Sequence, residues 1–463
     1  MKSHDVSELP PADTKVVHWP PLTTFTPYRR VLVSPTINTP APFKGYGGWN
    51  GWPETIRLQN GDLYVTFCAG YDHASMPTPL DAHPDYVAEV KRTLKTRGAP
   101  MQAWTFDWDC PTGGQIMWIR SRDRGATWTR PRPFPLIPHI DYSVTRLLQL
   151  RNGVLLATVR GRGANSLGFF ERMPVNALEF AQMAANRFPN EVVFLRSDDN
   201  GETWREWSRM RGPCLVMDGP RALFETPDGA LMMLIPGQPI PFGPGWPAAP
   251  DQASAQWIML AMRSEDQGLA WTTVSAFGLE HFDANEGCGG YLPDGSIGCL
   301  TRPTSAWFQS NDQGRTWSQP RRLQAGAGCG RECTLVALDS TVYLYTKGDL
   351  VVTPEGVTVA VFANLQAGGV GQAIYSRDSG RTWIMPSPKY GFQYDPWSYY
   401  PSACVLEDGS IFVVGTHEGI AADMESAVGA NPFGPRTCVV PAMRFRIKSA
   451  AEGEGIELLP LGK

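Results

Sequence analysis

The chain has 463 residues and a formal net charge of −4, and its acidic and basic residues are mixed along the sequence. It has no basic run of the kind that binds nucleic acid and no apolar run near the roughly 20 residues that span a bilayer, so neither partner is expected. Nine cysteines, an odd number in a chain long enough to bury a large core, predict free thiols in a reducing compartment.

The amino-terminal stretch MKSHDVSELPPADTK lacks the apolar segment of a signal peptide. As written, the chain is therefore expected in the cytoplasm, or in the periplasm or outside the cell if a leader was removed. Cys329 and Cys333 have no second cysteine pair or histidine cluster at ligand spacing, so no metal and no other cofactor is expected. The sequence leaves the oligomeric state open.

The predicted elements begin with a short strand at 28–34, YRRVLVS, and continue in chain order as six hairpins. Each hairpin is an apolar or alternating run, a tight turn and a second apolar run, and most of the turns contain Asn-Gly or Asp-Gly. The turns centre on Gly61, Gly153, Gly229, Gly295, Ser340 and Gly409.

A second frame, S-x-D-x-G-x-x-W, follows each of the first five hairpins. Its copies lie at 121–128, 197–204, 264–271, 310–317 and 376–383. In such a turn the aspartate accepts backbone N–H bonds, the glycine takes a positive φ and the tryptophan fills the gap beside the next strand. Because a ligand site usually occurs once whereas this frame recurs, we interpret the frame as structural.

Hairpin and frame together make a four-stranded unit, and six such units predict an all-β, six-bladed β-propeller with antiparallel blades. The sixth unit lacks the frame and ends with AMRFRI at 442–447, so the strand at 28–34 is expected to complete that blade and close the ring. The expected organisation is an extension at 1–27, one propeller at 28–448 and a tail at 449–463.

Both kinds of turn lie on one face of such a propeller, so the opposite face collects the start of each innermost strand and the end of the next. The positions nine residues before each turn centre are Trp52, Val144, Pro220, Glu286, Arg331 and Tyr400, and those seven residues after it are Cys68, Arg160, Pro236, Arg302, Lys347 and Thr416. Charged side chains beside buried strands are unusual unless they are paired, so this ring is the predicted site.

The repeated frames look like Asp boxes, and the chain from about 28 to 448 resembles the sialidase (neuraminidase) superfamily of six-bladed propellers. The segment ANEGCGGYLPDGSIGCLTR is similar to the fourth-blade segment of that family, matched by Glu286 and Arg302. The segment YYPSACVLEDGSIF is similar to the sixth-blade segment with the catalytic tyrosine, matched by Tyr400. The resemblance implies that Glu286 is the base for Tyr400, whose phenolate attacks the anomeric carbon of a sugar.

The general acid of that family is an aspartate on the loop after the first-blade hairpin. Here that loop opens CAGYDHASMPTP, so Asp72 is the candidate acid and His73 a candidate substrate-binding neighbour. Asp107 or Asp109 is an alternative acid, and a turn-capping role is the structural alternative for Asp72. Helices are expected in the loops over this face at 84–98 and 175–188, where they would wall a pocket. The aromatic residues Trp104, Phe106 and Trp108 either stack on sugar rings or pack this lid.

Two of the three arginines with which sialidases hold the substrate carboxylate are missing. The place of the first, two residues before a proline, is taken by Gly51, and the segment of the third, LQAGGVGQAIYS at 365–376, has no arginine. Only Arg302 remains. Replacement charge is expected from Arg331, Arg160 and Lys347, unless these are paired structural cations, and Trp52 joins the candidate substrate-binding residues.

These features favour an exo-glycoside hydrolase that releases a terminal acidic or polar sugar other than ordinary sialic acid from a glycan. The missing arginines favour the first alternative, a carbohydrate-binding propeller without catalysis. The second alternative is a polysaccharide lyase, in which a tyrosine and a histidine would move protons at a uronic acid.

Overall fold

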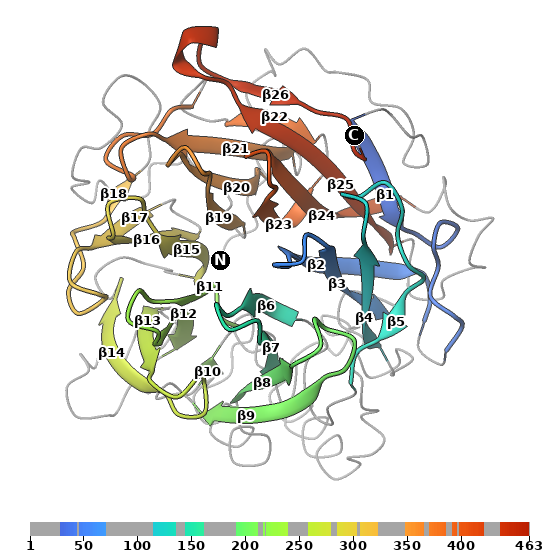
Figure 1. Cartoon of the computed structure of the whole chain (residues 1–463), viewed down its shortest axis with the longest axis horizontal. Coiled ribbons are helices and arrows are strands. Elements are labelled where there is room, and N and C mark those ends of the chain that lie inside the picture. The colour runs from blue at the N-terminus through green and yellow to red at the C-terminus, as the bar shows by residue number, and fades with distance from the viewer. Residues whose placement is uncertain are drawn as a thin grey trace, which may run out of the picture.

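The computed structural model describes residues 28–43, 46–70, 114–135, 144–161, 191–211, 216–217, 219–238, 258–278, 285–302, 306–322, 348–364, 370–385, 391–395, 398–420 and 436–462. Their strands form six antiparallel sheets around a central axis (Figure 1). The predicted all-β, six-bladed propeller is confirmed. The described part of the chain has no helix with the length and hydropathy of a membrane-spanning segment. The helices predicted at 84–98 and 175–188 lie outside the described residues.

The blades follow one another in chain order, and each runs outward from the axis (Figure 1). The first blade holds β2 (Trp49–Arg57), β3 (Leu63–Gly70), β4 (Gln115–Ser121) and β5 (Arg132–Pro133), and the second holds β6 (Val144–Gln149), β7 (Leu155–Gly161), β8 (Glu191–Ser197) and β9 (Arg205–Arg211). The third holds β10 (Val216–Met217) and β11 (Ala222–Glu225), both paired with β12 (Leu231–Gln238), then β13 (Ile258–Ser264) and β14 (Thr272–Phe277).

The fourth blade holds β15 (Asn285–Tyr291), β16 (Ile297–Arg302), β17 (Ala306–Ser310) and β18 (Arg321–Arg322), and the fifth holds β19 (Asp349–Val352), β20 (Thr358–Asn364), β21 (Val370–Ser376) and β22 (Phe392–Asp395). The sixth holds β23 (Tyr399–Val405), β24 (Ile411–Ile420) and β25 (Arg436–Ile447).

The ring is closed by a strand from the amino-terminal end of the described chain. Strand β1 (Arg29–Val33) pairs antiparallel with β25, with Arg29 opposite Met443 and Val33 opposite Val440. The predicted closing strand is thus confirmed. After residue 448, where a tail is expected, a 3-10 turn (Ala450–Glu452) leads to β26 (Ile456–Leu458), which also pairs with β25. Segments from both ends of the sequence therefore share one strand of the sixth blade.

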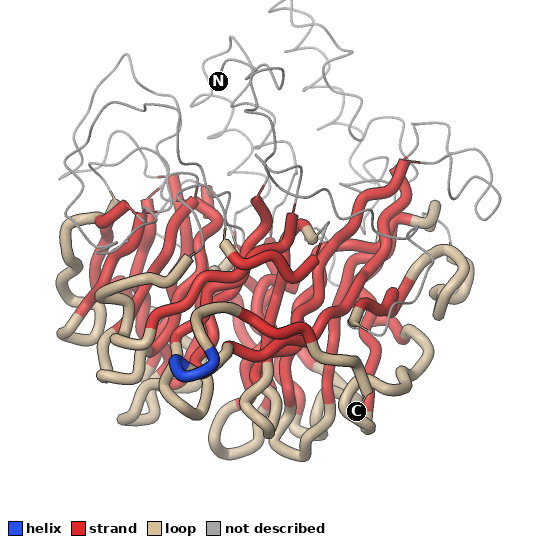
Figure 2. The backbone as a smooth tube through the Cα atoms, turned by 90° about the horizontal axis from the view of Figure 1, so that it is seen from above, coloured by secondary structure: helices blue, strands red, loops and turns tan. Residues whose placement is uncertain are grey.

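The repeated frames form turns at the same end of the propeller as the hairpin turns (Figure 2). In the first frame, Ser121 Oγ accepts the N–H of Gly125 at 2.7 Å and donates to Asp123 Oδ1 at 2.8 Å. The same Asp123 oxygen accepts the N–H of Thr127 at 2.7 Å, and the indole N–H of Trp128 donates to the carbonyl oxygen of Gly125. The serine-to-glycine bond recurs in the other four frames. These contacts support the structural interpretation of the frame.

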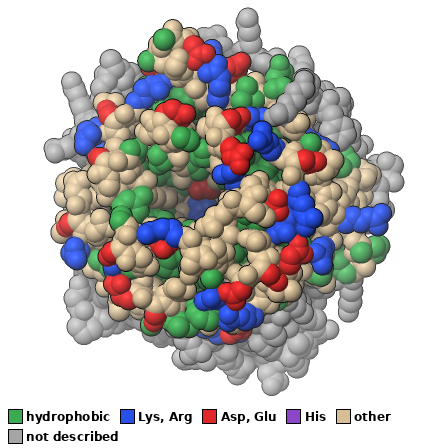
Figure 3. All heavy atoms as spheres, in the orientation of Figure 1, with side chains coloured by type: hydrophobic (Ala, Val, Ile, Leu, Met, Phe, Trp, Pro, Cys, Tyr) green, Lys and Arg blue, Asp and Glu red, His purple; other side chains and the backbone are tan. Residues whose placement is uncertain are grey.

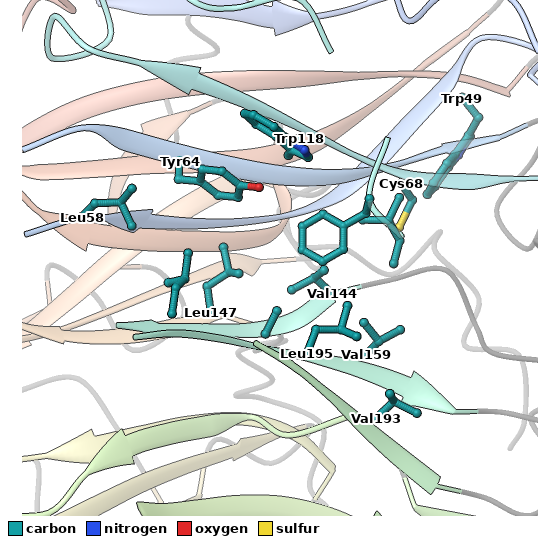
Figure 4. Close-up of a cluster of buried hydrophobic side chains, with 14 of the residues drawn as sticks. Trp49, Leu58, Tyr64, Cys68, Trp118, Val144, Leu147, Val159, Val193 and Leu195 are labelled. Carbon is teal, nitrogen blue, oxygen red and sulfur yellow. The ribbon is translucent and has the colours of Figure 1, made fainter. Parts of the chain in front are cut away.

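The core lies between neighbouring blades, because each sheet buries its faces only against the next one. Figure 4 shows this packing between the first two blades, where Trp49, Tyr64 and Trp118 meet Val144 and Leu195. The rings of Tyr64 and Trp118 are stacked with centroids 5.1 Å apart. Apolar side chains from consecutive units thus hold the ring together and fix where each innermost strand begins.

The predicted hairpin of the fifth blade is wrong. Its turn was expected at Ser340, but the innermost strands of this blade are β19 and β20, and their turn contains Gly356 with φ +77°. The Pro-Glu-Gly turn before VTVAVF supplies the glycine that a positive φ requires, and the segment LVALDSTVYLYT lies outside the described residues. Counted from Gly356, the ring positions of this blade are Lys347 and Ala363; the predicted ring residue Arg331 lies outside the described residues.

A buried polar contact ties the closing strand to the fifth and sixth blades. Arg29 Nε donates to Asp395 Oδ1 at 3.1 Å, and Arg29 Nη2 donates to His417 Nδ1 at 3.0 Å. The side chains of Arg29 and Asp395 are only 6% and 1% exposed. Burial, and after it the positive charge of Arg29, lower the pKa of His417 from 6.5 to about 3. The imidazole therefore stays neutral in the folded protein and accepts the arginine bond.

The free energy of unfolding is expected to fall as the pH is lowered from about 6.5 toward about 3. In that window the unfolded chain binds a proton at His417 that the folded chain does not, so protons favour unfolding; above pH 6.5 this loss is absent. Urea unfolding across the window measures the slope. His417→Gln keeps an acceptor for Arg29 but does not titrate, and a slope as steep in this variant as in the wild type would contradict the assignment.

Candidate active site

The innermost strands begin at the end of the propeller opposite the turns, and several of them carry a β-bulge near their start. The pairing register shifts between Gly51 and Glu54 in β2, Val144 and Arg146 in β6, Asn285 and Cys288 in β15, and Tyr399 and Ser402 in β23. A bulge inserts one residue and re-aims side chains. In β2 and β23 the inserted residues include Trp52 and Tyr400, whose φ values are +48° and +49°. Such values are strained for bulky aromatic residues, and strain of this kind gathers at functional sites.

A small pocket lies on the propeller axis where these strands begin. It is lined by Trp52, Pro53, Glu54, Val144, Arg146, Arg221, Gly348, Tyr400 and Pro401. The volume within which the centre of a water molecule can move is about 10 Å³, so the pocket has room for about one water. At the turn end, the space-filling view is hollowed at its centre, with acidic and basic side chains at depth (Figure 3). With room for about one water molecule, the pocket itself is too small to enclose a sugar ring, so a larger ligand has to lie above it.

The base of the pocket is a cluster of buried charges. Arg146 Nη1 lies 3.1 Å from Glu54 Oε2 and 3.4 Å from Asp349 Oδ2. Arg146 Nε donates to the carbonyl oxygen of Arg221 at 2.8 Å, and Nη2 bonds the same oxygen. Ser402 Oγ lies 3.1 Å from Glu54 Oε2 and 3.1 Å from Asp349 Oδ2. Strands of the first, second, fifth and sixth blades thus meet at one group of side chains, which we call the axial ion cluster: Glu54, Arg146, Asp349 and Ser402.

The axial ion cluster fixes the protonation of Arg146. Burial alone would lower the pKa of this guanidinium, but the carboxylates of Asp349 and Glu54 raise it above its ordinary value. All three charged side chains are largely buried: Arg146 is 9% exposed, Glu54 is 11% exposed and Asp349 is 15% exposed. With the buried Arg221 on the same pocket, the described part of the base holds two guanidiniums and two carboxylates, and these charges balance.

The thiol of Cys288 lies within electrostatic reach of Asp349 and Arg146. Burial, and after it the negative charge of Asp349, raise the pKa of Cys288 to about 12. The thiol therefore remains protonated and is no nucleophile. Cys68, Cys299, Cys404 and Cys438 are also buried. Cys329 and Cys333 lie outside the described residues.

Three aromatic rings follow one another along the first-blade side of the pocket. The ring of Trp52 packs edge-on against the rings of Trp49 and Tyr400. The distance between ring centroids is 4.9 Å to Trp49 and 6.2 Å to Tyr400. The backbone N–H of Trp52 donates to Thr416 Oγ1 at 2.7 Å, which ties the bulge of β2 to β24. Tyr400 thus reaches the pocket beside an indole whose backbone is held by the sixth blade.

The structure brings only some of the predicted site residues together. Tyr400 and Trp52 line the pocket, as their ring positions predict. Glu286 lies in the bulged start of β15, one residue after Asn285, whose backbone is opposite Arg302 in β16. Arg160 lies near the end of β7; for these last three residues the described part is the backbone. The remaining predicted residues lie outside the described ranges: Asp72, His73, Arg331 and Lys347, together with the alternatives Asp107 and Asp109.

Sequence reasoning missed the axial ion cluster and Arg221. Glu54 and Arg146 stand seven residues before their turn glycines, and Asp349 stands seven residues before Gly356. The predicted ring contains only the positions nine residues before each turn centre, so it passes over these three residues. A charged residue inside WPETIRL, VTRLLQL and GDLVVT, each an otherwise largely apolar inner strand, is the signal that would have found the cluster.

The packing leaves no room for a side chain at Gly51, or at Gly371 in the segment of the third arginine. A Cβ on Gly51 would lie 2.7 Å from Trp49 Cη2 and 3.0 Å from Thr416 Cγ2. In the segment of the third arginine, a Cβ on Gly371 would lie 2.8 Å from Ser398 Cβ. Both places are filled by neighbouring side chains. A carboxylate clamp like that of sialidases therefore cannot form at Gly51 or Gly371 without displacing them.

No known protein-family model and no curated protein sequence matches the chain. Among solved structures, it is similar to a protein of unknown function from Dyadobacter fermentans, with a TM-score of 0.53 and 14% identity over 91% of this chain and 100% of the other. It is also similar to the NanB sialidase from Streptococcus pneumoniae, with a TM-score of 0.53 and 12% identity over 91% of this chain and 71% of the other. At these identities the similarity shows the fold, which is a sialidase-like six-bladed propeller.

Proposed function

We propose that the chain is a glycoside hydrolase that releases a terminal sugar other than ordinary sialic acid from a glycan, with Tyr400 as its nucleophile. The observation that carries the proposal is the place of Tyr400, which lies on the axial pocket at a strained bulge. Its segment is also the one that resembles the tyrosine segment of sialidases. The sialidase-like fold supports the same class of reaction, although fold alone does not fix function.

The proposed roles follow the resemblance residue by residue. Oη of Tyr400 bonds to the anomeric carbon as the bond to the leaving oxygen breaks; Glu286 takes the phenol proton and Asp72 protonates the leaving oxygen. Water then attacks the same carbon and gives a proton to Asp72. The bond from sugar to tyrosine breaks, and the phenolate recovers its proton from Glu286.

The substrate is proposed to differ from sialic acid because the first arginine is replaced by Gly51 and the segment of the third, 365–376, has no arginine. Bidentate arginine contacts to a carboxylate contribute on the order of 1.5–3 kcal/mol each. Losing two of them lowers the affinity for a 2-keto sugar acid by about two to four powers of ten. Arg160, Lys347 and Arg302 stay proposed substrate contacts.

A panel of nitrophenyl glycosides and acidic polysaccharides tests the proposal. We expect release of nitrophenol from at least one glycoside that is not a sialoside, and weak or absent release from the aryl sialoside. An unsaturated product that absorbs in the ultraviolet would instead identify a lyase. Glycan binding by calorimetry without any turnover would identify a binding propeller. Efficient cleavage of the aryl sialoside would contradict the proposed specificity.

A further inference from the structure

The same local structure, a β-bulge with a positive-φ residue before a proline, places Trp52 and Tyr400 on the pocket. Each stands before a proline, in the sequences Trp52-Pro53 and Tyr400-Pro401, and each lies in a bulge of an innermost strand with φ near +50°. A non-glycine residue in this conformation costs on the order of 1–3 kcal/mol and persists only where the surroundings determine it. The first and sixth blades are neighbours in the closed ring, so the two bulges lie side by side (Figure 1).

We infer that Trp52 contacts the substrate and makes the site select a neutral sugar ring, with the indole next to Gly51, the place of the first arginine of sialidases. The inference rests on the proposed function and names its substrate class. It concerns a residue that the reaction itself does not need, because Trp52 carries no group that transfers a proton or bonds to the sugar.

Geometry favours the contact for a sugar that Tyr400 attacks. The reacting carbon has to lie within about 3–3.5 Å of the phenolic oxygen. The centroid of the Trp52 ring is 6.2 Å from that of Tyr400, and both residues line one pocket. A sugar ring seated for attack on the Trp52 side of Tyr400 therefore lies beside the indole. An indole offers a flat apolar surface on which the C–H face of a sugar can pack.

Charge and space favour a neutral ring over an acidic one. A Cβ on Gly51 would lie 2.7 Å from Trp49 Cη2, so an indole ring occupies the space that a side chain at Gly51, the place of the first sialidase arginine, would need. Arg146 is already bonded to Glu54, Asp349 and the carbonyl oxygen of Arg221. Because the described charges of the base balance, a carboxylate brought here would lose its hydration with no net positive charge from these side chains to replace it.

The experiment compares nitrophenyl glycosides of neutral pentoses and hexoses with nitrophenyl glucuronide and the aryl sialoside. We expect kcat/KM for the best neutral glycoside to exceed that for both acidic ones by at least about tenfold. Trp52→Gly, which relieves the positive φ while removing the indole, should lower kcat/KM for the neutral substrate by about 10- to 100-fold, mainly through KM. Trp52→Phe keeps an aromatic face and should retain most of the activity. Trp317→Phe, at an Asp-box tryptophan stacked on Phe277 at the turn end, is the matched control.

Each outcome decides the matter. Turnover of the glucuronide or the sialoside at or above the rate of neutral glycosides would overturn the inference while leaving the hydrolase in place, as would unchanged kcat/KM in Trp52→Gly. If the wild type turns over no glycoside, the proposed function fails, and calorimetric titration with neutral oligosaccharides then tests the contact alone. Binding that is lost in Trp52→Gly and kept in Trp317→Phe would support the contact without catalysis. If Trp52→Gly does not fold, as judged by its thermal unfolding, Trp52→Leu takes its place, because leucine packs on Trp49 without an aromatic face.

Discussion

Tyr400→Phe is expected to abolish turnover of the true substrate, by about a thousandfold or more in kcat, while the affinity for the intact glycan stays within about threefold. The substitution removes the nucleophilic oxygen but keeps the ring that meets Trp52 edge-on, so the walls of the pocket are preserved. Steady-state kinetics on the best glycoside, with calorimetric binding of the same glycan, measures both effects.

Tyr399→Phe is the matched control for this prediction. Tyr399 precedes Tyr400 in β23, is likewise half-buried, and is not among the residues that line the pocket. The same loss of one hydroxyl group at this position should leave kcat within about twofold, because no step of the proposed reaction uses it. Full activity of Tyr400→Phe would refute the mechanism, and equal losses in both variants would show that the strand, rather than the phenol, is at fault.

Arg146→Met is expected to lower the free energy of unfolding by about 3–5 kcal/mol. Methionine fills much of the space, but Glu54 and Asp349 are left as two buried carboxylates without their shared cation. Ser402, which bonds both, cannot balance their charge. Chemical unfolding at neutral pH measures the loss. Adding Glu54→Gln and Asp349→Asn to the variant should recover much of it, because neutral amides no longer need a counter-ion.

An exposed pair gives the comparison. Arg381 lies 2.9 Å from Asp294, with side chains 63% and 26% exposed, and such pairs contribute about 1 kcal/mol or less. Arg381→Met should therefore be nearly neutral. A loss in Arg146→Met no larger than that in Arg381→Met would show that the axial ion cluster contributes nothing beyond an ordinary surface pair.

The fold could be predicted because its turns are determined locally. Five of the predicted turns have a glycine with positive φ, a conformation that glycine adopts without steric cost: Gly61, Gly153, Gly229, Gly295 and Gly409. The fifth blade shows the limit of the same reasoning. Its turn has the sequence Pro-Glu-Gly and departs from the Asn-Gly and Asp-Gly pattern, so the pattern places the turn of this blade at Ser340 instead of Gly356.

The site could be predicted only in part, for a different physical reason. Trp52 and Tyr400 lie at counted ring positions, and counting works because strand geometry repeats from blade to blade. The link between Glu54, Arg146 and Asp349 joins residues of three blades across the axis, and no local pattern indicates which charged side chains will meet. The strain at Trp52 likewise depends on the bulge and on Thr416, far away in sequence.

The pairing of β1 with β25 sets the order of events when the chain is made. Strand β1 leaves the ribosome roughly 400 residues before its partner, residues 436–447. At about 5–20 residues per second, that interval is about 20–80 s. Until then the polar backbone edge of β1 has no native strand to pair with, and the first blade lacks the sixth as its neighbour. The seam between the two chain ends is thus the last interface to form during synthesis, which makes it the step at which a nascent chain is most exposed to pairing with another copy of itself.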